Sequence, residues 1–206
     1  MHDSVTVLGF VTDFADQGVI LPLIAAVAVS LGLNARWRLA CVWLGATSFV
    51  LGATLALKVG CYLCGVFAPA LGLQQAGLVS PSGHVAAACI AYGGLVALFA
   101  RPAGSGRVAC AVSLAIAVVV GATRVALGDH SWGEVVIGAA IGTVGAVSFT
   151  VFAARAAGTV SNRALIGACL PVLLLFHGVH LSFEQTIHHA SAEVFNNLGQ
   201  LRAPGW

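Results

Sequence analysis

The chain has 206 residues, of which 59% are hydrophobic and only 8% are charged, and its formal net charge is +2. Because a water-soluble domain carries about 25% charged residues, this composition excludes a soluble globular protein. The small, evenly spread net charge also excludes nucleic acid as a partner. The sequence therefore predicts an integral membrane protein whose surroundings are the lipid bilayer.

The apolar stretches are long enough to cross the hydrocarbon core as helices of about 20 residues, and none alternates as a membrane strand would. We expect an all-α bundle of about six transmembrane helices that forms one domain over residues 1–206. Cys61–Leu73 is also apolar but is interrupted by glycine and proline, so it is interpreted as a re-entrant or interfacial segment. In chain order, the expected spans are Gly18–Leu33, Leu39–Leu57, Val85–Ala100, Val108–Val125, Val135–Ala153 and Ala164–Phe183.

The basic residues are unevenly distributed between the two ends of the expected bundle. Six of the nine Lys and Arg residues fall in the three connections that share one end, and the positive-inside rule assigns that end to the cytoplasm. Residues 1–17 contain no Lys or Arg, so we expect the first span to be retained rather than cleaved as a signal peptide. These features predict a bacterial cytoplasmic (inner) membrane protein with both termini outside, facing the periplasm.

Four of the six cysteines fall within expected spans, where a thiol packs as a small apolar group. Cys61 and Cys64 form a C-x-x-C at the expected outer end, where an oxidising compartment permits a disulfide. Two unpaired thiols are the equal alternative.

Pro81-Ser82-Gly83-His84 directly precedes an uninterrupted apolar stretch, which places it at the start of a helix. Backbone N–H groups and the positive end of the helix dipole favour an anion such as phosphate at this place. Gly83 allows an oxyanion to approach the backbone, and the Ser82 hydroxyl adds a donor. The alternative is a structural role, with Ser82 as the N-cap and Pro81 as a helix-start residue.

A second polar string precedes the fifth expected span. It contains Arg124, His130 and Glu134, and Ser131 with Glu134 matches the pattern of a capping box. On the structural alternative, Glu134 only closes the helix start and Arg124 is a snorkelling cation. Ionisable groups at membrane depth are nevertheless expensive and mark function when they cluster. We therefore predict that both strings contribute to one site at the outer membrane interface.

The groups expected there suit phosphoryl transfer. Lys58 and Arg124 supply positive charge against a phosphate dianion, and Arg124 can bind two of its oxygens. A neutral imidazole is a nucleophile toward phosphorus when an acceptor such as Glu134 holds its other ring N–H. A second imidazole can protonate the leaving alkoxide and later activate water. Because cations and donors cover the phosphate, this chemistry needs no metal and no cofactor.

These strings resemble two motifs of the type 2 phosphatidic acid phosphatase superfamily, which includes vanadium haloperoxidases and bacterial acid phosphatases. The family pattern is a Lys-containing first motif, then Pro-Ser-Gly-His, then Ser-Arg-x5-His-x3-Asp, and the resemblance extends over about residues 58–138. It implies that His130 is the nucleophile, His84 the general acid and Glu134 the orienting carboxylate. The resemblance also implies phosphate binding by Lys58, Ser82, Gly83 and Arg124.

The chain departs from the family pattern at three places. Thr123 replaces serine and Glu134 replaces aspartate, and both replacements keep the functional group. The family's first motif runs Lys-x6-Arg-Pro, whereas Gly65 and Val66 occupy the positions counted from Lys58. What replaces the missing arginine is left open.

Further polar residues lie toward the two ends of the chain. His177, His180, Glu184 and His188 recur at helical spacing, so they would share one face of the last span and its extension. An interfacial polar stripe is the main interpretation and a transition-metal site the lesser one. Asp13 and Asp16 are interpreted as polar flanks of the first span.

The sequence thus predicts a metal-independent lipid phosphatase that acts through a phosphohistidine. Its expected partner is a membrane lipid phosphate: a polyprenyl (pyro)phosphate, phosphatidate, phosphatidylglycerophosphate or a lipid A phosphate. A lipid-to-lipid phosphotransferase on the same site is one alternative, and a non-enzymatic anion transporter or lipid-binding membrane protein is another. The sequence leaves the lipid and the oligomeric state undetermined.

Overall fold

The computed structural model describes residues 2–67, 80–100, 105–156 and 161–181, and the regular secondary structure in these ranges is entirely α-helical. The all-α prediction is therefore confirmed. The described helices are α1 (His2–Asp13), α2 (Gln17–Leu33), α3 (Trp37–Phe67), α4 (Gly83–Phe99), α5 (Ser105–Ala126), α6 (Trp132–Arg155) and α7 (Asn162–Phe176).

Each expected span overlaps one of the helices α2 to α7. Among the described residues, four segments are long and apolar enough to cross a membrane: Val7–Leu33, Trp37–Cys61, Ser105–Ala126 and Trp132–Arg155. The helices α4 and α7 are apolar but shorter, and α4 is the most deeply buried of the set. These properties are those of a membrane helical bundle.

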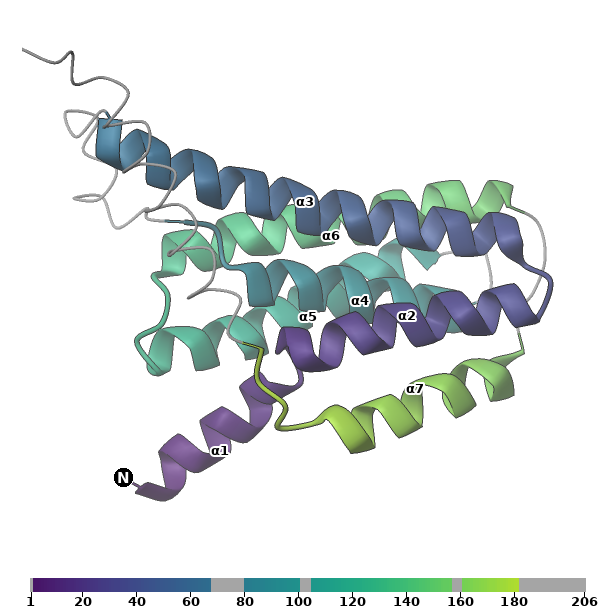
Figure 1. Cartoon of the computed structure of the whole chain (residues 1–206), viewed down its shortest axis with the longest axis horizontal. Coiled ribbons are helices and arrows are strands. Elements are labelled where there is room, and N and C mark those ends of the chain that lie inside the picture. The colour runs from purple at the N-terminus through teal and green to yellow at the C-terminus, as the bar shows by residue number, and fades with distance from the viewer. Residues whose placement is uncertain (1, 68–79, 101–104, 157–160, 182–206) are drawn as a thin grey trace, which may run out of the picture.

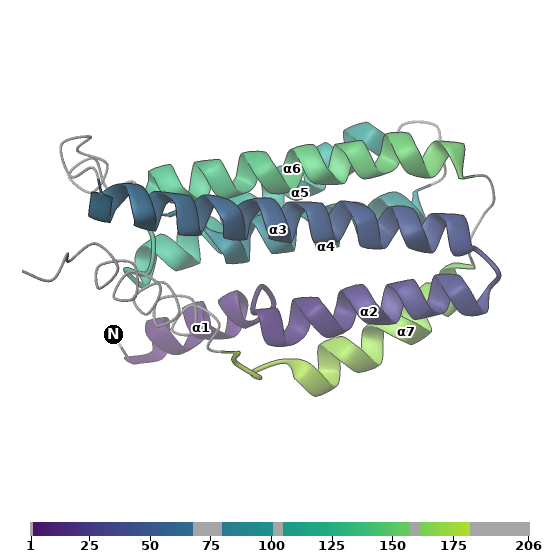
Figure 2. The same cartoon turned by 45° about the horizontal axis from the view of Figure 1, so that its top comes forward.

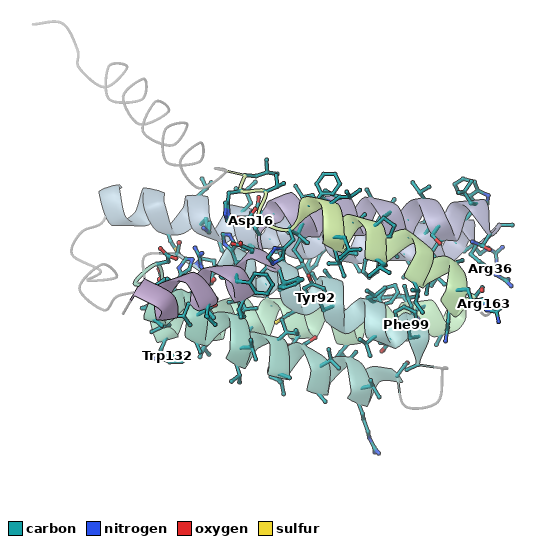
Figure 3. All side chains as sticks on the ribbon, turned by 90° about the horizontal axis from the view of Figure 1, so that it is seen from below. Asp16, Arg36, Tyr92, Phe99, Trp132 and Arg163 are labelled. Carbon is teal, nitrogen blue, oxygen red and sulfur yellow. The ribbon has the colours of Figure 1, made fainter. Side chains whose placement is uncertain are left out.

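The helices form two groups, as Figures 1 and 2 show. The helices α3, α4, α5 and α6 pack together, and the pair α2 and α7 lies along one side of them. The short helix α1 diverges from the bundle at the end where α6 begins (Figure 1). Figure 3 shows Arg36 and Arg163 at the opposite end from Trp132, so the bundle has a distinctly basic end and a motif-bearing end.

Trp43 contacts both groups of helices. Trp43 of α3 is fully buried, and its indole Nε1 donates a hydrogen bond of 3.0 Å to the carbonyl of Ile24 on α2. Its ring meets Phe149 of α6 edge-on, with the ring centroids 5.4 Å apart. Such a packed aromatic pair, together with a satisfied indole donor, fixes α2 and α6 against the same helix.

The helix α3 is longer than the sequence predicts. It continues without a break through Phe67, so the described part of Cys61–Leu73 is helical rather than re-entrant. At 1.5 Å per residue its 31 residues extend about 46 Å, well beyond a hydrocarbon core of about 30 Å. The glycines at 60 and 65 do not end the helix because glycine weakens a helix without breaking it. Cys61 is a free thiol in this structure, and the side chain of Cys64 lies outside the described part.

The last helix is shorter than predicted. It ends at Phe176, and Gly178 then adopts a φ of +81°, which turns the chain out of the helical path. The expected helical face that joins His177 to His180 is therefore wrong, because both residues follow the helix. Glu184 and His188 lie outside the described residues.

Candidate active site

The start of α6 is closed by a capping box that also holds an imidazole. Ser131 is the N-cap, its Oγ accepts from the Glu134 N–H at 3.4 Å, and Glu134 Oε2 accepts from the Ser131 N–H at 2.9 Å. The same Oε2 lies 3.2 Å from Nδ1 of His130, and both side chains are buried. Glu134 thus caps the start of α6 and contacts the His130 ring at the same time, so the two roles are not alternatives.

The turn between α5 and α6 brings His130 to this position. Gly128 has a φ of +79°, a conformation that L side chains rarely adopt and that glycine adopts without strain. The chain then folds back, so that the N–H groups of Asp129 and His130 both donate to the carbonyl of Arg124, at 3.0 and 3.4 Å. The Arg124 guanidinium forms an ion pair with Asp129, with Nη1 3.1 Å from Oδ2.

The segment that precedes α4 is joined to the same glutamate. Ser80 donates its backbone N–H to Glu134 Oε1 at 2.7 Å, and Ser82 donates its N–H to the Glu134 backbone carbonyl at 3.0 Å. The two strings singled out in the sequence are therefore directly bonded through Ser82 and Glu134, and Ser80, which precedes the first string, adds a second bond.

Lys58 comes to this end of the bundle from α3. A Cβ added to Gly83 would lie 3.7 Å from Cε of Lys58 and 4.0 Å from Cγ2 of Thr54, so α3 passes beside the first residue of α4. Lys58 therefore lies within the long helix α3, and not at a span end followed by an irregular segment as expected.

Among the buried polar atoms that lack a hydrogen-bond partner within the described residues, two belong to residues that the sequence predicts to bind phosphate. They are Oγ of Ser82, which is fully buried at the N-cap of α4 and makes no side-chain cap bond, and Nε of Arg124. An unsatisfied buried donor is costly unless a ligand completes it. Both atoms belong to the phosphate-binding set that the sequence predicts, so their chemistry fits an oxyanion.

Thr123 occupies the serine position of the family pattern. Its hydroxyl is buried and donates to the carbonyl of Val120 at 2.7 Å, one turn earlier in α5. The Thr123 hydroxyl therefore donates its proton to the backbone of its own helix.

His84 faces a residue that sequence reasoning set aside. Its Nε2 lies 3.7 Å from Oδ2 of Asp16, the N-cap of α2, and both side chains are largely buried. Asp16 was interpreted as a polar flank. Its position beside an apolar helix could have marked it as a functional candidate, because a carboxylate at membrane depth is costly. The structure thus adds Asp16 to the surroundings of the predicted site, and Figure 3 shows it beside a group of side-chain nitrogens.

The two described histidines after α7 pack against α1 and its junction with α2. The ring of His177 lies between Phe10 and Phe14, at centroid distances of 4.4 and 4.3 Å, and its Nε2 donates to the Phe10 carbonyl at 3.1 Å. His180 lies near Asp13 and Asp16. Within the described ranges, no three His, Cys, Asp or Glu side chains form a group able to hold a metal ion.

Close packing fixes the distance between the two strings. A Cβ on Gly138 of α6 would collide with the carbonyl oxygen of Ser82, and one on Gly142 would collide with the backbone of Ala86. The small residues of α6 therefore let the start of α4 approach the α6 backbone. The small residues of α6 therefore also set the position of Ser82 at the start of α4.

We expect Gly138→Ala to lower both stability and activity. The added methyl meets backbone rather than a movable side chain, so Ser82 must shift, at a cost of about 1–3 kcal/mol of unfolding free energy. Thermal unfolding in detergent and phosphate release measure the two effects. Gly52→Ala on α3 is the matched control, because a Cβ there meets nothing within 4 Å. Equal behaviour of the two variants would contradict the packing argument.

The comparisons with known proteins agree with this geometry. Residues 65–157 match the family model described as the PAP2 superfamily, and this segment contains both bonded strings. No curated protein and no solved structure gave a match. The superfamily implies phosphatase activity on phosphate esters, often of lipids. The match over the segment that carries His84, His130 and Glu134 supports a member of the PAP2 superfamily of type 2 phosphatidic acid phosphatases.

Proposed function

We propose that this protein is a metal-independent membrane lipid phosphatase that acts through a phosphohistidine on His130. The observation that carries the proposal is the Glu134 carboxylate, which meets Nδ1 of His130 while it bonds the segment that starts α4. An acceptor at Nδ1 selects the tautomer in which Nε2 carries the lone pair. The bonds from Ser80 and Ser82 to Glu134 support this proposal, because they join the start of α4 to the glutamate that contacts His130.

In the first step, Nε2 of His130 attacks phosphorus and the bond from phosphorus to the ester oxygen breaks. The departing oxygen takes a proton from the His84 imidazolium and leaves as an alcohol or, from a diphosphate, as a phosphate. The positive charge that forms on the His130 ring is stabilised by Glu134, in the manner of other carboxylate–histidine pairs.

In the second step, a water oxygen bonds to phosphorus and the bond to Nε2 breaks. The electron pair of that bond returns to the His130 ring, and the water proton passes to His84, which regains its initial state. Both histidines therefore finish the cycle as they began it, and the products are inorganic phosphate and the dephosphorylated lipid.

Phosphate binding in this proposal uses the four residues predicted from the sequence. Backbone N–H groups at the start of α4 and the Ser82 hydroxyl donate to the phosphate oxygens, and Gly83 leaves room for their approach. The Lys58 and Arg124 cations balance the charge that a metal would otherwise balance. Since Asp129 already pairs with Arg124, the guanidinium is held in place before substrate arrives.

An apolar cavity supports a lipid rather than a soluble substrate. A cavity of about 740 Å³ lies between α3 and α6, the two helices that carry Lys58 and Glu134, and Ser148 is the one polar residue among those that line it. Ala53 marks its end nearest Lys58, about one turn along α3. We propose that the hydrocarbon tail of the substrate occupies this cavity while its phosphate meets His130.

Ala53→Phe tests the position of the tail. The larger ring narrows the cavity near the site, so we expect KM for a long-chain lipid phosphate to rise about tenfold, or ~1.4 kcal/mol. A short-chain analogue should change by less than about twofold, since it does not reach the cavity. Val118→Phe on α5 is the control, because Val118 is exposed and does not line the cavity. An equal rise for both chain lengths would place the tail elsewhere.

The proposed function is tested by phosphate release from lipid phosphates in detergent, with a panel that covers phosphatidate, phosphatidylglycerophosphate, polyprenyl phosphates and diphosphates and lipid A phosphates. We expect hydrolysis that survives chelators and is inhibited by vanadate, which mimics five-coordinate phosphorus. Hydrolysis that stops with EDTA would contradict metal independence. No hydrolysis of any panel member would favour an anion transporter or a lipid-binding protein. Transfer of labelled phosphate to a second lipid instead of water would identify a phosphotransferase.

A further inference from the structure

Asp16 lies outside the segment that matches the family model, at the junction of α1 and α2. It is only 8% exposed, and it comes from a part of the chain about 70 positions before His84. A buried carboxylate is costly in an apolar bundle unless several partners compensate it. Its contacts therefore indicate what the residue does.

The two oxygens of Asp16 have different partners. Oδ1 accepts from the N–H groups of Gly18, at 2.7 Å, and Leu181, at 3.2 Å. Oδ2 lies 3.4 Å from Nδ1 of His180 and 3.7 Å from Nε2 of His84. One oxygen thus caps α2 and fastens the segment after α7, whereas the other faces two imidazoles.

Capping alone does not account for this arrangement. An N-cap requires a single acceptor oxygen, which Oδ1 provides. The second oxygen is directed at the ring that the proposed reaction uses as its acid, in the way that Glu134 Oε2 is directed at the ring of the nucleophile. Each of the two imidazoles is therefore matched with a carboxylate from a different helix start.

We propose that Asp16 is a positioning residue for His84, an inference that rests on the proposed function. The carboxylate faces the Nε2–H group of His84, which keeps its proton, and so fixes the ring plane and stabilises the imidazolium. The opposite nitrogen, Nδ1, then carries the proton that passes to the departing oxygen as the bond from phosphorus to that oxygen breaks. In the second half of the cycle the same nitrogen takes the proton of the attacking water. Asp16 keeps its own charge throughout.

Asp16→Asn separates this role from the structural one. Asparagine is also a good N-cap, and its carbonyl oxygen can keep the bonds from Gly18 and Leu181. Its amide NH2 replaces the oxygen that faces His84 and so removes the charge. Asp13→Asn is the matched control, since Asp13 is the neighbouring carboxylate and lies 3.6 Å from Nε2 of the exposed His180.

The experiment compares kcat/KM for two leaving groups, an alkyl lipid phosphate and an activated aryl phosphate such as p-nitrophenyl phosphate, together with inhibition by vanadate. For Asp16→Asn we expect kcat/KM to fall about 30-fold for the alkyl ester, because a poor leaving group depends on its proton donor. The aryl ester should change by less than about threefold, and vanadate should inhibit as in the wild type. Asp13→Asn should change neither substrate.

A double-mutant cycle with His84→Ala completes the test. If Asp16 acts through His84, Asp16→Asn has no further effect on the alkyl ester once His84 is removed. An effect of the same size in both backgrounds overturns the inference. Equal losses for both esters with weakened vanadate inhibition also overturn it, since they indicate a structural role alone. Unchanged kcat/KM in Asp16→Asn overturns the inference but not the proposed function. Absence of hydrolysis by the wild type overturns the proposed function, and the inference with it.

Discussion

His130→Ala is expected to reduce phosphate release by at least about 10⁴-fold, because the variant has no atom to accept the phosphoryl group. Acid-labile, base-stable phosphate on the wild-type chain after rapid quenching is the direct measurement of the intermediate. That signal should be absent from the variant. The fold should survive, since the turn is closed by bonds from backbone N–H groups to the Arg124 carbonyl, which do not depend on the imidazole.

His177→Ala is the control for loss of an imidazole at the same end of the bundle. His177 packs against Phe10 and Phe14 and takes no part in the proposed chemistry, so its activity should remain within about threefold of the wild type. Unaltered turnover in His130→Ala, or labelled phosphate still bound to that variant, would remove His130 as the nucleophile.

Glu134→Gln is expected to lower kcat/KM by about 10³-fold with little loss of fold. The glutamine offers one acceptor oxygen where the carboxylate offers two, and those two receive the N–H groups of Ser80 and Ser131 and meet Nδ1 of His130. An amide NH2 that faces Nδ1 favours the tautomer in which Nε2 carries the proton and has no lone pair to attack phosphorus. In addition, no negative charge remains beside the ring to stabilise it during transfer. Steady-state kinetics and thermal unfolding of the same preparation measure the two quantities.

Ser131→Ala distinguishes orientation of His130 from capping of α6. It removes the hydroxyl half of the capping box at a cost of about 1 kcal/mol of stability but leaves the Glu134 carboxylate in place. We expect its activity to stay within about threefold of the wild type. If Glu134→Gln and Ser131→Ala lose activity equally, Glu134 contributes only as a cap.

The bundle and the core of the site were predictable because hydrophobicity and helix-start chemistry are local signals. Runs of apolar residues predicted α2 to α7, and the polar strings before α4 and α6 lie where their N-terminal positions predicted. The pairing of His130 with Glu134 also followed from spacing, since residues four apart can meet across a helix start.

Other features were not predictable because they depend on contacts between distant segments. Nothing local to Asp16 shows that the start of α2 lies beside His84 rather than in the headgroup region. The length of α3 was underestimated because Gly65, Pro69 and Gly72 were taken to interrupt a helix from Cys61 onward, whereas α3 continues through Gly65 to Phe67. The histidines after α7 were assigned a helical face, whereas a glycine with positive φ at 178 redirects the chain.

The bond from Ser82 N–H to the Glu134 carbonyl is a link between two main chains. The peptide groups that form it remain when a side chain is shortened or replaced by one of the same size. Ser82→Ala and Glu134→Gln should therefore retain this link. Kinetic defects measured in these two variants can then be assigned mainly to lost chemistry and not to separation of the two helix starts.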